Sequence, residues 1–276
     1  MAKELIKIDL TAILERRLGR RAKWVPRFLL RALERLVHQE ELNRLLAAIY
    51  PAEGSEFSRR LMEELEVSVS VEGLDRLPEG ERFEFVSNHP LGGLDGIALV
   101  GVLGARYGDR NLRVLVNDML MHVTPLASVF LPVNKYGSQG REAARAISEA
   151  FASPRQIVMF PAGLVSRRHP DGTIRDLEWQ KACVVKALES GRRIVPVYFH
   201  GLNTPRFYRI AYWRKRLGIK VNIEQALLPG ELCRARGSAF RIIFGAPIDV
   251  APLRAAGETP AAIAASLRRE VYKLAD

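Results

Sequence analysis

Residues 82–108 read RFEFVSNHPLGGLDGIALVGVLGARYG, and three kinds of local structure follow one another along this stretch. The first seven residues carry the aromatic and β-branched side chains that are typical of a strand. The apolar run from residue 96 onward predicts a buried helix. Between them, three glycines accompany a histidine and an aspartate, which indicates a tight turn. A strand, a turn and a helix in this order predict an α/β fold.

The same alternation of strand and helix continues along the rest of the chain. Further strands are predicted at 67–73, 112–117, 127–134, 155–160, 192–199 and 240–245. Further helices are predicted at 138–152, 176–190, 206–218 and 259–274. This alternation predicts a central mixed, mainly parallel sheet flanked by helices.

The first 66 residues depart from this pattern because they are predicted to be entirely helical. Apolar residues recur at helical spacing in the segments 8–18, 26–50 and 57–66. We therefore predict a helical N-terminal extension over residues 1–66, with helices for packing and for contact with a membrane surface. The α/β domain is predicted to cover residues 67–276.

The charge of the chain indicates a polyanionic partner. Lys and Arg number 42 against 31 Asp and Glu, which gives a net charge of +11. Nucleic acid, an anionic membrane surface and an acidic protein are the three candidates. Nucleic acid is disfavoured, because the basic residues are spread along the chain and no nucleic-acid-binding motif is present.

Cysteine usage and hydropathy indicate the compartment of the protein and its relation to the membrane. Cys183 and Cys233 are the two cysteines, and they form no CxxC pair. We therefore expect a reducing compartment and neither a metal nor a cofactor. The N-terminus lacks the apolar core of a signal peptide, and no stretch reaches the roughly 18 apolar residues of a spanning helix. A soluble or peripheral protein on the cytoplasmic side is expected.

His89 and Asp95 are the first candidate catalytic residues, because they follow a predicted strand. Ligand sites of α/β sheets form beyond the carboxyl ends of strands. An Asp can fix the tautomer of a His, whose other nitrogen then takes a proton from a hydroxyl. The alternative is structural: His89 ends a strand and Asp95 caps the next helix. The pair alone does not separate the two interpretations.

A second polar loop follows the strand at 155–160. The stretch MFPAGLVSRR (159–168) contains Ser166, Arg167 and Arg168. Backbone N–H groups and guanidinium groups in such a turn could bind a phosphate or a carboxylate. The alternative is a solvated basic turn.

A third polar loop contains Asn134, Lys135 and Arg141 after the strand at 127–134. In isolation these residues could be an ordinary helix cap. If the strands are parallel, however, all three loops lie at one edge of the sheet. Their joint occurrence favours a functional site at that edge.

Four motifs together resemble those of the glycerolipid acyltransferase family of the lysophosphatidic acid type. They are SNHPLGGLD, FLPVNK, FPAGLVSRR and IVPVYF, in the order that the family shows. NHPLGGLDG, DLEWQKA, VPVYFHGLNTPRFYRIA and RKRLGIKVNIEQALLP resemble a narrower bacterial branch. That branch contains acyltransferases described as hemolysins and enzymes that O-acylate acylated amino acids.

The resemblance implies a peripheral membrane O-acyltransferase of lipid biosynthesis, on the cytoplasmic face of the inner membrane. Its donor would be an acyl carrier protein or coenzyme A thioester, and its acceptor the hydroxyl of a lysophospholipid or an N-acyl amino acid lipid. His89, oriented by Asp95, would be the general base. The residues implied in substrate binding are Asn88, Gly92, Gly93, Lys135, Pro161, Gly163, Ser166, Arg167 and Arg168.

Three positions depart from the family pattern. Five residues, not four, separate His89 from Asp95, so the loop must bulge if the two side chains are to form the hydrogen bond that we expect. Ala162 replaces the family Glu, and Lys135 stands where Arg is usual. The loss of the Glu leaves open a catalytically idle, lipid-binding scaffold of the same fold.

Two basic segments with aromatic residues could contact a membrane. The first is the leader around Trp24 and Phe28, and the second is 206–218 with Tyr208, Tyr212 and Trp213. Helices packed against the domain, with the aromatics in the core, are the alternative.

Overall fold

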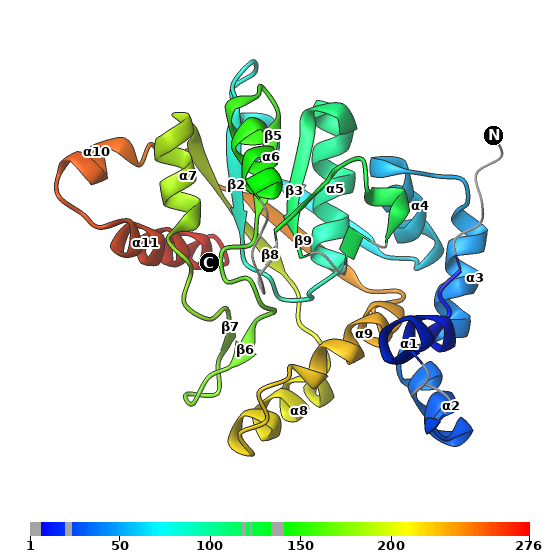
Figure 1. Ribbon diagram of the computed structural model, residues 1–276. Helices are drawn as coiled ribbons and strands as arrows, with labels where there is room; N and C mark the ends of the chain where they lie inside the picture. Colours follow the sequence, from blue (N-terminus) through cyan, green and yellow to red (C-terminus); the bar gives the residue numbers. More distant parts are fainter. Residues whose placement is uncertain (1–6, 20–23, 118–119, 122, 134–140) are drawn as a thin grey trace.

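The computed structural model describes residues 7–19, 24–117, 120–121, 123–133 and 141–276. Its centre is a seven-stranded sheet in the order β1-β9-β8-β2-β5-β3-β4 (Figure 1). The strands are β1 (Ser68–Glu72), β2 (Phe83–Ser87), β3 (Leu112–Val116), β4 (Phe130–Pro132), β5 (Gln156–Met159), β8 (Arg193–His200) and β9 (Ala239–Phe244). A separate antiparallel hairpin is formed by β6 (Arg167–Arg168) and β7 (Ile174–Arg175).

The directions of the strands confirm the predicted sheet. β2 is parallel to β5 and β8, β3 is parallel to β4 and β5, and β1 is parallel to β9. β8 and β9 pair in antiparallel fashion. The sheet is therefore mixed and mainly parallel, and the carboxyl ends of β2, β5 and β8 lie at one edge.

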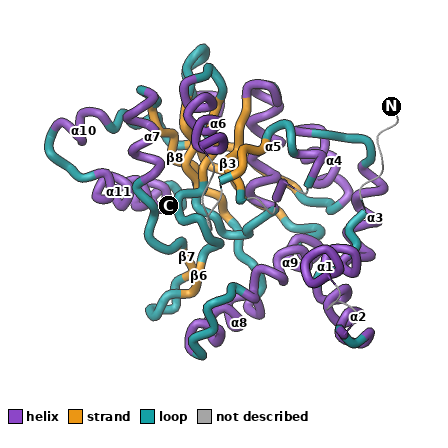
Figure 2. The backbone as a smooth tube through the Cα atoms, in the orientation of Figure 1, coloured by secondary structure: helices purple, strands orange, loops and turns teal. Residues whose placement is uncertain are grey.

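Helices cover both faces of the sheet (Figures 1 and 2). The helices that cover one face are α3 (Gln39–Ile49), α4 (Gly54–Glu64) and α5 (Leu94–Tyr107). Those on the other are α6 (Arg141–Ala152), α7 (Ala182–Ser190), α10 (Ala251–Ala255) and α11 (Pro260–Lys273). Successive side chains of a strand point to opposite faces, so Phe83 and Phe85 enter one core while Val86 enters the other.

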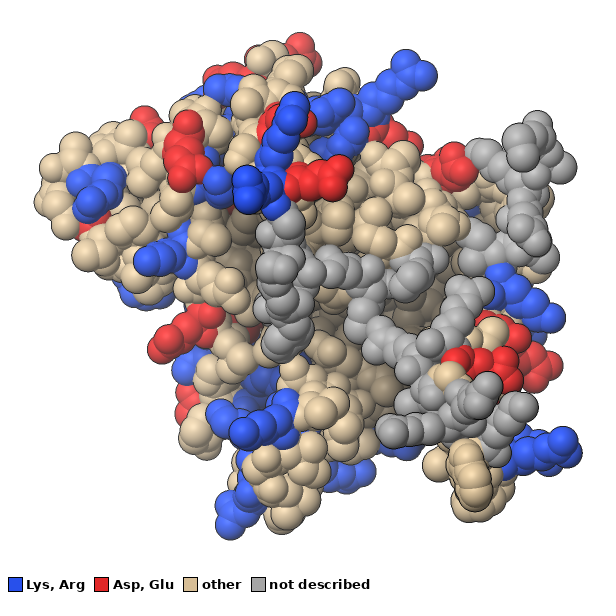
Figure 3. Space-filling model, viewed as in Figure 1, with Lys and Arg blue, Asp and Glu red and all other residues tan. Residues whose placement is uncertain are grey.

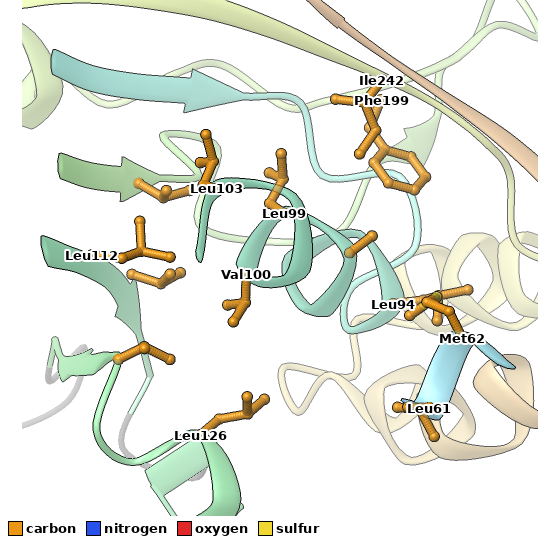
Figure 4. Close-up of a cluster of buried hydrophobic side chains, with 14 of the residues drawn as sticks. Leu61, Met62, Leu94, Leu99, Val100, Leu103, Leu112, Leu126, Phe199 and Ile242 are labelled. Carbon is orange, nitrogen blue, oxygen red and sulfur yellow. The ribbon is translucent and has the colours of Figure 1, made fainter. Parts of the chain in front are cut away.

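α5 lies at the centre of the first of these cores. Leu94, Leu99, Val100 and Leu103 project from it, and Figure 4 shows Leu103 beside Leu112 of β3. α3 and α4 of the N-terminal segment contribute to the same core. The apolar run from residue 96 therefore anchors the helix that follows the His-Asp turn.

The regular elements in the described residues up to Glu64 are all helices, but the continuous helix predicted at 26–50 is wrong at its centre. It is divided into α2 (Arg27–Leu36) and α3, and a shorter helix, α1 (Leu10–Leu18), precedes them. His38 separates the two with a positive φ of 53°. That left-handed conformation interrupts a right-handed helix.

Two further segments depart from the predicted boundaries. The helix predicted at 176–190 begins only at Ala182, so residues 176–181 belong to a loop. The connection from β8 to β9 contains η6 (Ile223–Leu227) and α9 (Leu228–Arg234) in addition to the predicted helix, α8 (Pro205–Arg216).

Single turns of 3-10 helix are η2 (Leu74–Arg76), η3 (Asp109–Asn111) and η5 (Thr124–Leu126). Among the described residues, no helix combines the length and the apolar character needed to cross a bilayer.

Candidate active site

The loops that follow β2 and β5 meet at one edge of the sheet, as the sequence predicts. The two strands are parallel neighbours, with Val86 opposite Met159. A backbone hydrogen bond from Ser166 N to His89 O, 2.8 Å long, joins the two loops. Asn134 and Lys135 of the third predicted loop lie outside the described residues, and Arg141 is the first residue of α6.

The side chains of His89 and Asp95 are in contact, which confirms the predicted hydrogen bond. His89 Nδ1 lies 3.0 Å from Asp95 Oδ2. The Asp95 side chain is fully buried, whereas the His89 side chain is 17% exposed. The ring of Phe160 packs on the imidazole with 4.2 Å between ring centroids. The arrangement therefore holds the histidine firmly and leaves part of it accessible.

The glycine turn explains how five intervening residues are accommodated. Gly92 has a φ of +78°, a conformation that favours glycine. This turn directs the N–H groups of Leu91 and Gly92 to Asp95 Oδ2, at 2.9 and 3.2 Å. Gly93 is the N-cap of α5, so Asp95 lies in the first turn of the helix. The N-terminal end of a helix dipole stabilises a carboxylate there.

The two groups shift each other's pKa. Burial alone raises the pKa of Asp95, but the charge and hydrogen bond of His89 and the N–H groups of Leu91 and Gly96 outweigh it, so the pKa is lowered. Burial also opposes a charged His89, yet the charge and hydrogen bond of Asp95, with a contribution from Asp176, raise its pKa above the usual 6.5. An ionised Asp95 accepting from Nδ1 leaves Nε2 as the nitrogen that takes up a proton.

Asn88 links the catalytic turn to β8. Its Oδ1 accepts from Phe199 N at 2.7 Å, and its Nδ2 donates to Phe199 O at 3.0 Å. The side chain is buried, so both ends of its amide serve the strand backbone. The predicted contact of Asn88 with a substrate stays a prediction.

Asp176 joins the site, although the sequence analysis did not select it. Its Oδ1 accepts from Ser166 Oγ at 2.6 Å and from His89 N at 3.1 Å, and its Oδ2 accepts from Trp179 Nε1 at 2.9 Å. Its backbone N–H donates to the Tyr272 hydroxyl of α11 at 2.7 Å. The sequence predicts a helix over the stretch DLEWQKA, whereas the structure places Asp176 in the loop before α7.

The Asp176 carboxylate is buried, and burial raises its pKa despite the hydrogen bonds from Ser166, Trp179 and the His89 backbone. Ser166, predicted to bind substrate, thus has its hydroxyl engaged by Asp176.

The arginines of the second motif differ in their surroundings. Arg167 Nη2 lies 2.8 Å from Glu224 Oε1, and Glu224 Oε2 lies 2.8 Å from Arg214 Nε of α8. Glu224 is fully buried. Arg168 is exposed. Of the two predicted anion-binding arginines, Arg167 already has a carboxylate partner within the protein.

The remaining predicted residues form the turn after β5. Pro161 is buried, and its carbonyl accepts from Gln180 N at 3.0 Å. Gly163 has a φ of +61°, and its N–H donates to Phe160 O at 2.9 Å. Both residues thereby hold the loop that presents Phe160 to His89.

Neither cysteine is suited to act as a nucleophile. Cys183 and Cys233 are buried, and burial raises the pKa of each to about 12. Among the described residues, one group could hold a metal: His38, Glu41 and Cys233, with ligand atoms within 4.8 Å of one another. Arg234 Nη2 lies 3.2 Å from His38 Nε2, and its positive charge opposes a cation there.

Comparison with known proteins identifies the class. A family model described as Acyltransferase matches residues 12–276. The chain belongs to this acyltransferase family, and the resemblance seen in the four motifs is thereby confirmed.

Individual relatives are consistent with the narrower branch. The chain is 43% identical, over 97% of its length and 95% of the relative's, to a protein of Phocaeicola vulgatus named lyso-glycine lipid O-acyltransferase. A protein of the same name from Bacteroides thetaiotaomicron is 41% identical over 98% of both chains. Among solved structures, the 1-acyl-sn-glycerophosphate acyltransferase PlsC of Thermotoga maritima matches with a TM-score of 0.49 and 15% identity, over 96% of this chain and 95% of that one.

Proposed function

We propose that this acyltransferase moves a fatty acyl group from a thioester to the hydroxyl of a lyso-lipid, with His89 as the general base. The observation that carries the proposal is the 3.0 Å contact between His89 Nδ1 and the buried Asp95. It lies at the carboxyl edge of a mainly parallel sheet, where α/β proteins place their ligands.

The proposed reaction needs one proton shuttle. His89 Nε2 takes the proton of the acceptor hydroxyl, and the oxygen attacks the thioester carbonyl carbon. The C–S bond of the resulting tetrahedral intermediate breaks, and the imidazolium returns the proton to the leaving thiolate. The products are an ester and a thiol. Asp95 stabilises the imidazolium in between.

Direct transfer of the acyl group from donor to acceptor is supported over a mechanism in which a cysteine is first acylated. A nucleophilic cysteine needs a lowered pKa and some exposure. Cys183 and Cys233 have the opposite properties, since burial raises both pKa values to about 12.

For the acceptor, a lyso-lipid built on an acylated amino acid is favoured over a lysophospholipid. The two relatives above 40% identity are named for lyso-glycine lipid. The guanidinium of Arg167 is engaged by the buried Glu224, so it is not free to bind the phosphate of lysophosphatidic acid.

The donor and the location belong to the same proposal. An acyl carrier protein or coenzyme A supplies the thioester, and the net charge of +11 suits an acidic carrier and an anionic surface alike. We propose a peripheral enzyme on the cytoplasmic face of the inner membrane. Catalysis is assigned to residues 67–276, and packing and surface contact to residues 1–66.

The test pairs each labelled donor with each acceptor. Acyl carrier protein and coenzyme A thioesters are offered with an N-acyl-glycine lipid that carries a free hydroxyl, and with lysophosphatidic acid. We expect label in the glycine lipid at a higher kcat/KM than in the phospholipid. The opposite preference contradicts the assignment of the acceptor. Equal vesicle binding by the wild type and His89→Ala with no transfer by either would favour the scaffold interpretation.

A further inference from the structure

One short segment gathers much of the exposed apolar surface. Thirteen large hydrophobic side chains are exposed among the described residues, and six of them lie between 212 and 223. They are Tyr212, Trp213, Leu217, Ile219, Val221 and Ile223. Leu217 and Val221 are 69% and 70% exposed. Clustered exposure of this kind marks an interaction surface.

The inner face of the same segment is firmly packed. Phe207, Tyr208 and Ala211 of α8 are buried, and Phe207 and Tyr208 form a small core with Leu227 and with Val165 of the loop after β5. Outward residues of α8 recur at helical spacing, as Arg209, Tyr212, Trp213 and Arg216. The outer surface is therefore held rigidly, and its apolar character is not a result of poor packing.

The charge of the segment is of one sign. Residues 205–223, which we call the docking segment, contain six Lys or Arg and no Asp or Glu. The guanidinium of Arg216 lies 6.0 Å from the centre of the Trp213 ring. In Figure 3 the lower end of the molecule, where Figure 1 places α8, shows blue and tan atoms. Glu224, the next residue, is enclosed between Arg167 and Arg214.

We propose that the docking segment inserts into the interface of an anionic lipid bilayer. This inference rests on the proposed function and names the surface that it uses. Aromatic rings beside cations, followed by exposed aliphatic side chains, match the interface between headgroups and acyl chains. Lys and Arg side chains near an anionic membrane add electrostatic attraction to it. An acidic carrier protein would use the cations but not six projecting apolar side chains.

The position of the segment fits the delivery of a membrane-bound acceptor. Trp24 and Phe28, which are 86% and 75% exposed, belong to the region of α2, and α2 and α8 lie at the same end of the molecule (Figure 1). The docking segment also contacts the loop after β5, because Val165 of that loop packs with Phe207 and Tyr208. Glu224, the residue after the segment, forms an ion pair with Arg167. A docked enzyme thus places the loops around His89 close to the bilayer.

The test measures binding to vesicles of phosphatidylcholine with and without phosphatidylglycerol, by co-sedimentation at low and high salt. The wild type is compared with Leu217→Ser/Val221→Ser. The control is Val71→Ser, on edge strand β1, where the side chain is 39% exposed. We expect wild-type binding that needs phosphatidylglycerol and weakens with salt, and at least a tenfold loss in the double variant only.

Several outcomes overturn the proposal. The proposal fails if the wild type does not bind anionic vesicles or if the double variant binds them like the wild type. It also fails if the Val71→Ser control loses as much vesicle binding as the double variant. A double variant that keeps vesicle binding but loses binding to an acyl carrier protein would assign the segment to that partner instead. Thermal unfolding verifies that each variant is folded. The binding readout needs no turnover, and His89→Ala is expected to bind as wild type does, so failure of the acyl transfer reaction is distinguishable.

Discussion

At the scale of single residues, the His89–Asp95 pair determines how activity depends on pH. The pKa of His89 is raised above 6.5, because the charge and hydrogen bond of Asp95 outweigh the effect of burial. A general base works only when it is unprotonated. We therefore expect acyl transfer to decline as pH falls through a value above 6.5, and to be constant on the alkaline side until another group titrates.

Asp95→Asn tests the cause of that shift. An amide keeps the shape of the side chain but removes the charge that raises the pKa of His89. We expect the acid limb of the kcat/KM profile to move to lower pH while the maximal rate falls at least tenfold. A profile with an unchanged acid limb would show that another group controls the titration.

Asp176→Asn tests a positioning residue. The buried carboxylate accepts from Ser166 Oγ, His89 N and Trp179 Nε1, and an amide cannot replace all three bonds. Hydrogen bonds to charged groups contribute about 1.5–3 kcal/mol each. We expect kcat to fall at least tenfold with little change in KM, together with a lower melting temperature.

The matched control is Asp171→Asn, in the β6–β7 hairpin five residues away, where the side chain is 51% exposed. Equal effects of the two substitutions on kcat would contradict the positioning role of Asp176.

At the scale of elements, the turn between β2 and α5 requires glycine at position 92. A Cβ there would lie 2.3 Å from Val165 Cγ2, and the φ of +78° disfavours any side chain. The left-handed conformation alone costs about 1–2 kcal/mol. Gly92→Ala should therefore lower both the free energy of unfolding and the rate of acyl transfer.

Gly96→Ala serves as the control for this turn, because its Cβ would meet Phe160 at an ordinary 3.7 Å within helix α5. Alanine is favoured over glycine in helices by about 0.5–1 kcal/mol. Urea unfolding should place the two variants on opposite sides of the wild type. Equal stability of both would contradict the account of the turn.

Much of the element order is predictable, since the seven strands of the central sheet and helices α5 to α8 follow hydrophobic periodicity, whereas the short β6–β7 hairpin carries no such signal. Contacts that depend on residues far apart in the chain are not. The Asp176 carboxylate meets His89 across 87 positions, and Glu224 meets Arg167 across 57. The break at His38 is not predictable either, because it depends on one backbone angle within a continuous apolar pattern.

At the scale of the whole molecule, Glu224 connects the catalytic loops to the docking segment. Its carboxylate pairs with Arg167 of β6 and with Arg214 of α8. Removing one partner of a buried ion pair costs about 3–5 kcal/mol, because the remaining charge is left without compensation. Glu224→Gln should lower the free energy of unfolding by that amount in a urea titration.

Glu149→Gln provides the comparison, since its partner Arg145 is 81% exposed. Exposed pairs contribute less than about 1 kcal/mol. A Glu224→Gln variant as stable as Glu149→Gln would show that the buried ion pairs do not hold β6 and the docking segment together.

The central claim is that His89 removes the proton from the acceptor hydroxyl. The most direct measurement is the rate of acyl transfer by the wild type and by His89→Ala, with one donor and one acceptor at saturating concentrations and with both proteins verified as folded. General-base catalysis contributes about 10²–10⁴-fold, and we predict a loss in this range. A His89→Ala enzyme within a few-fold of the wild type would contradict the mechanism.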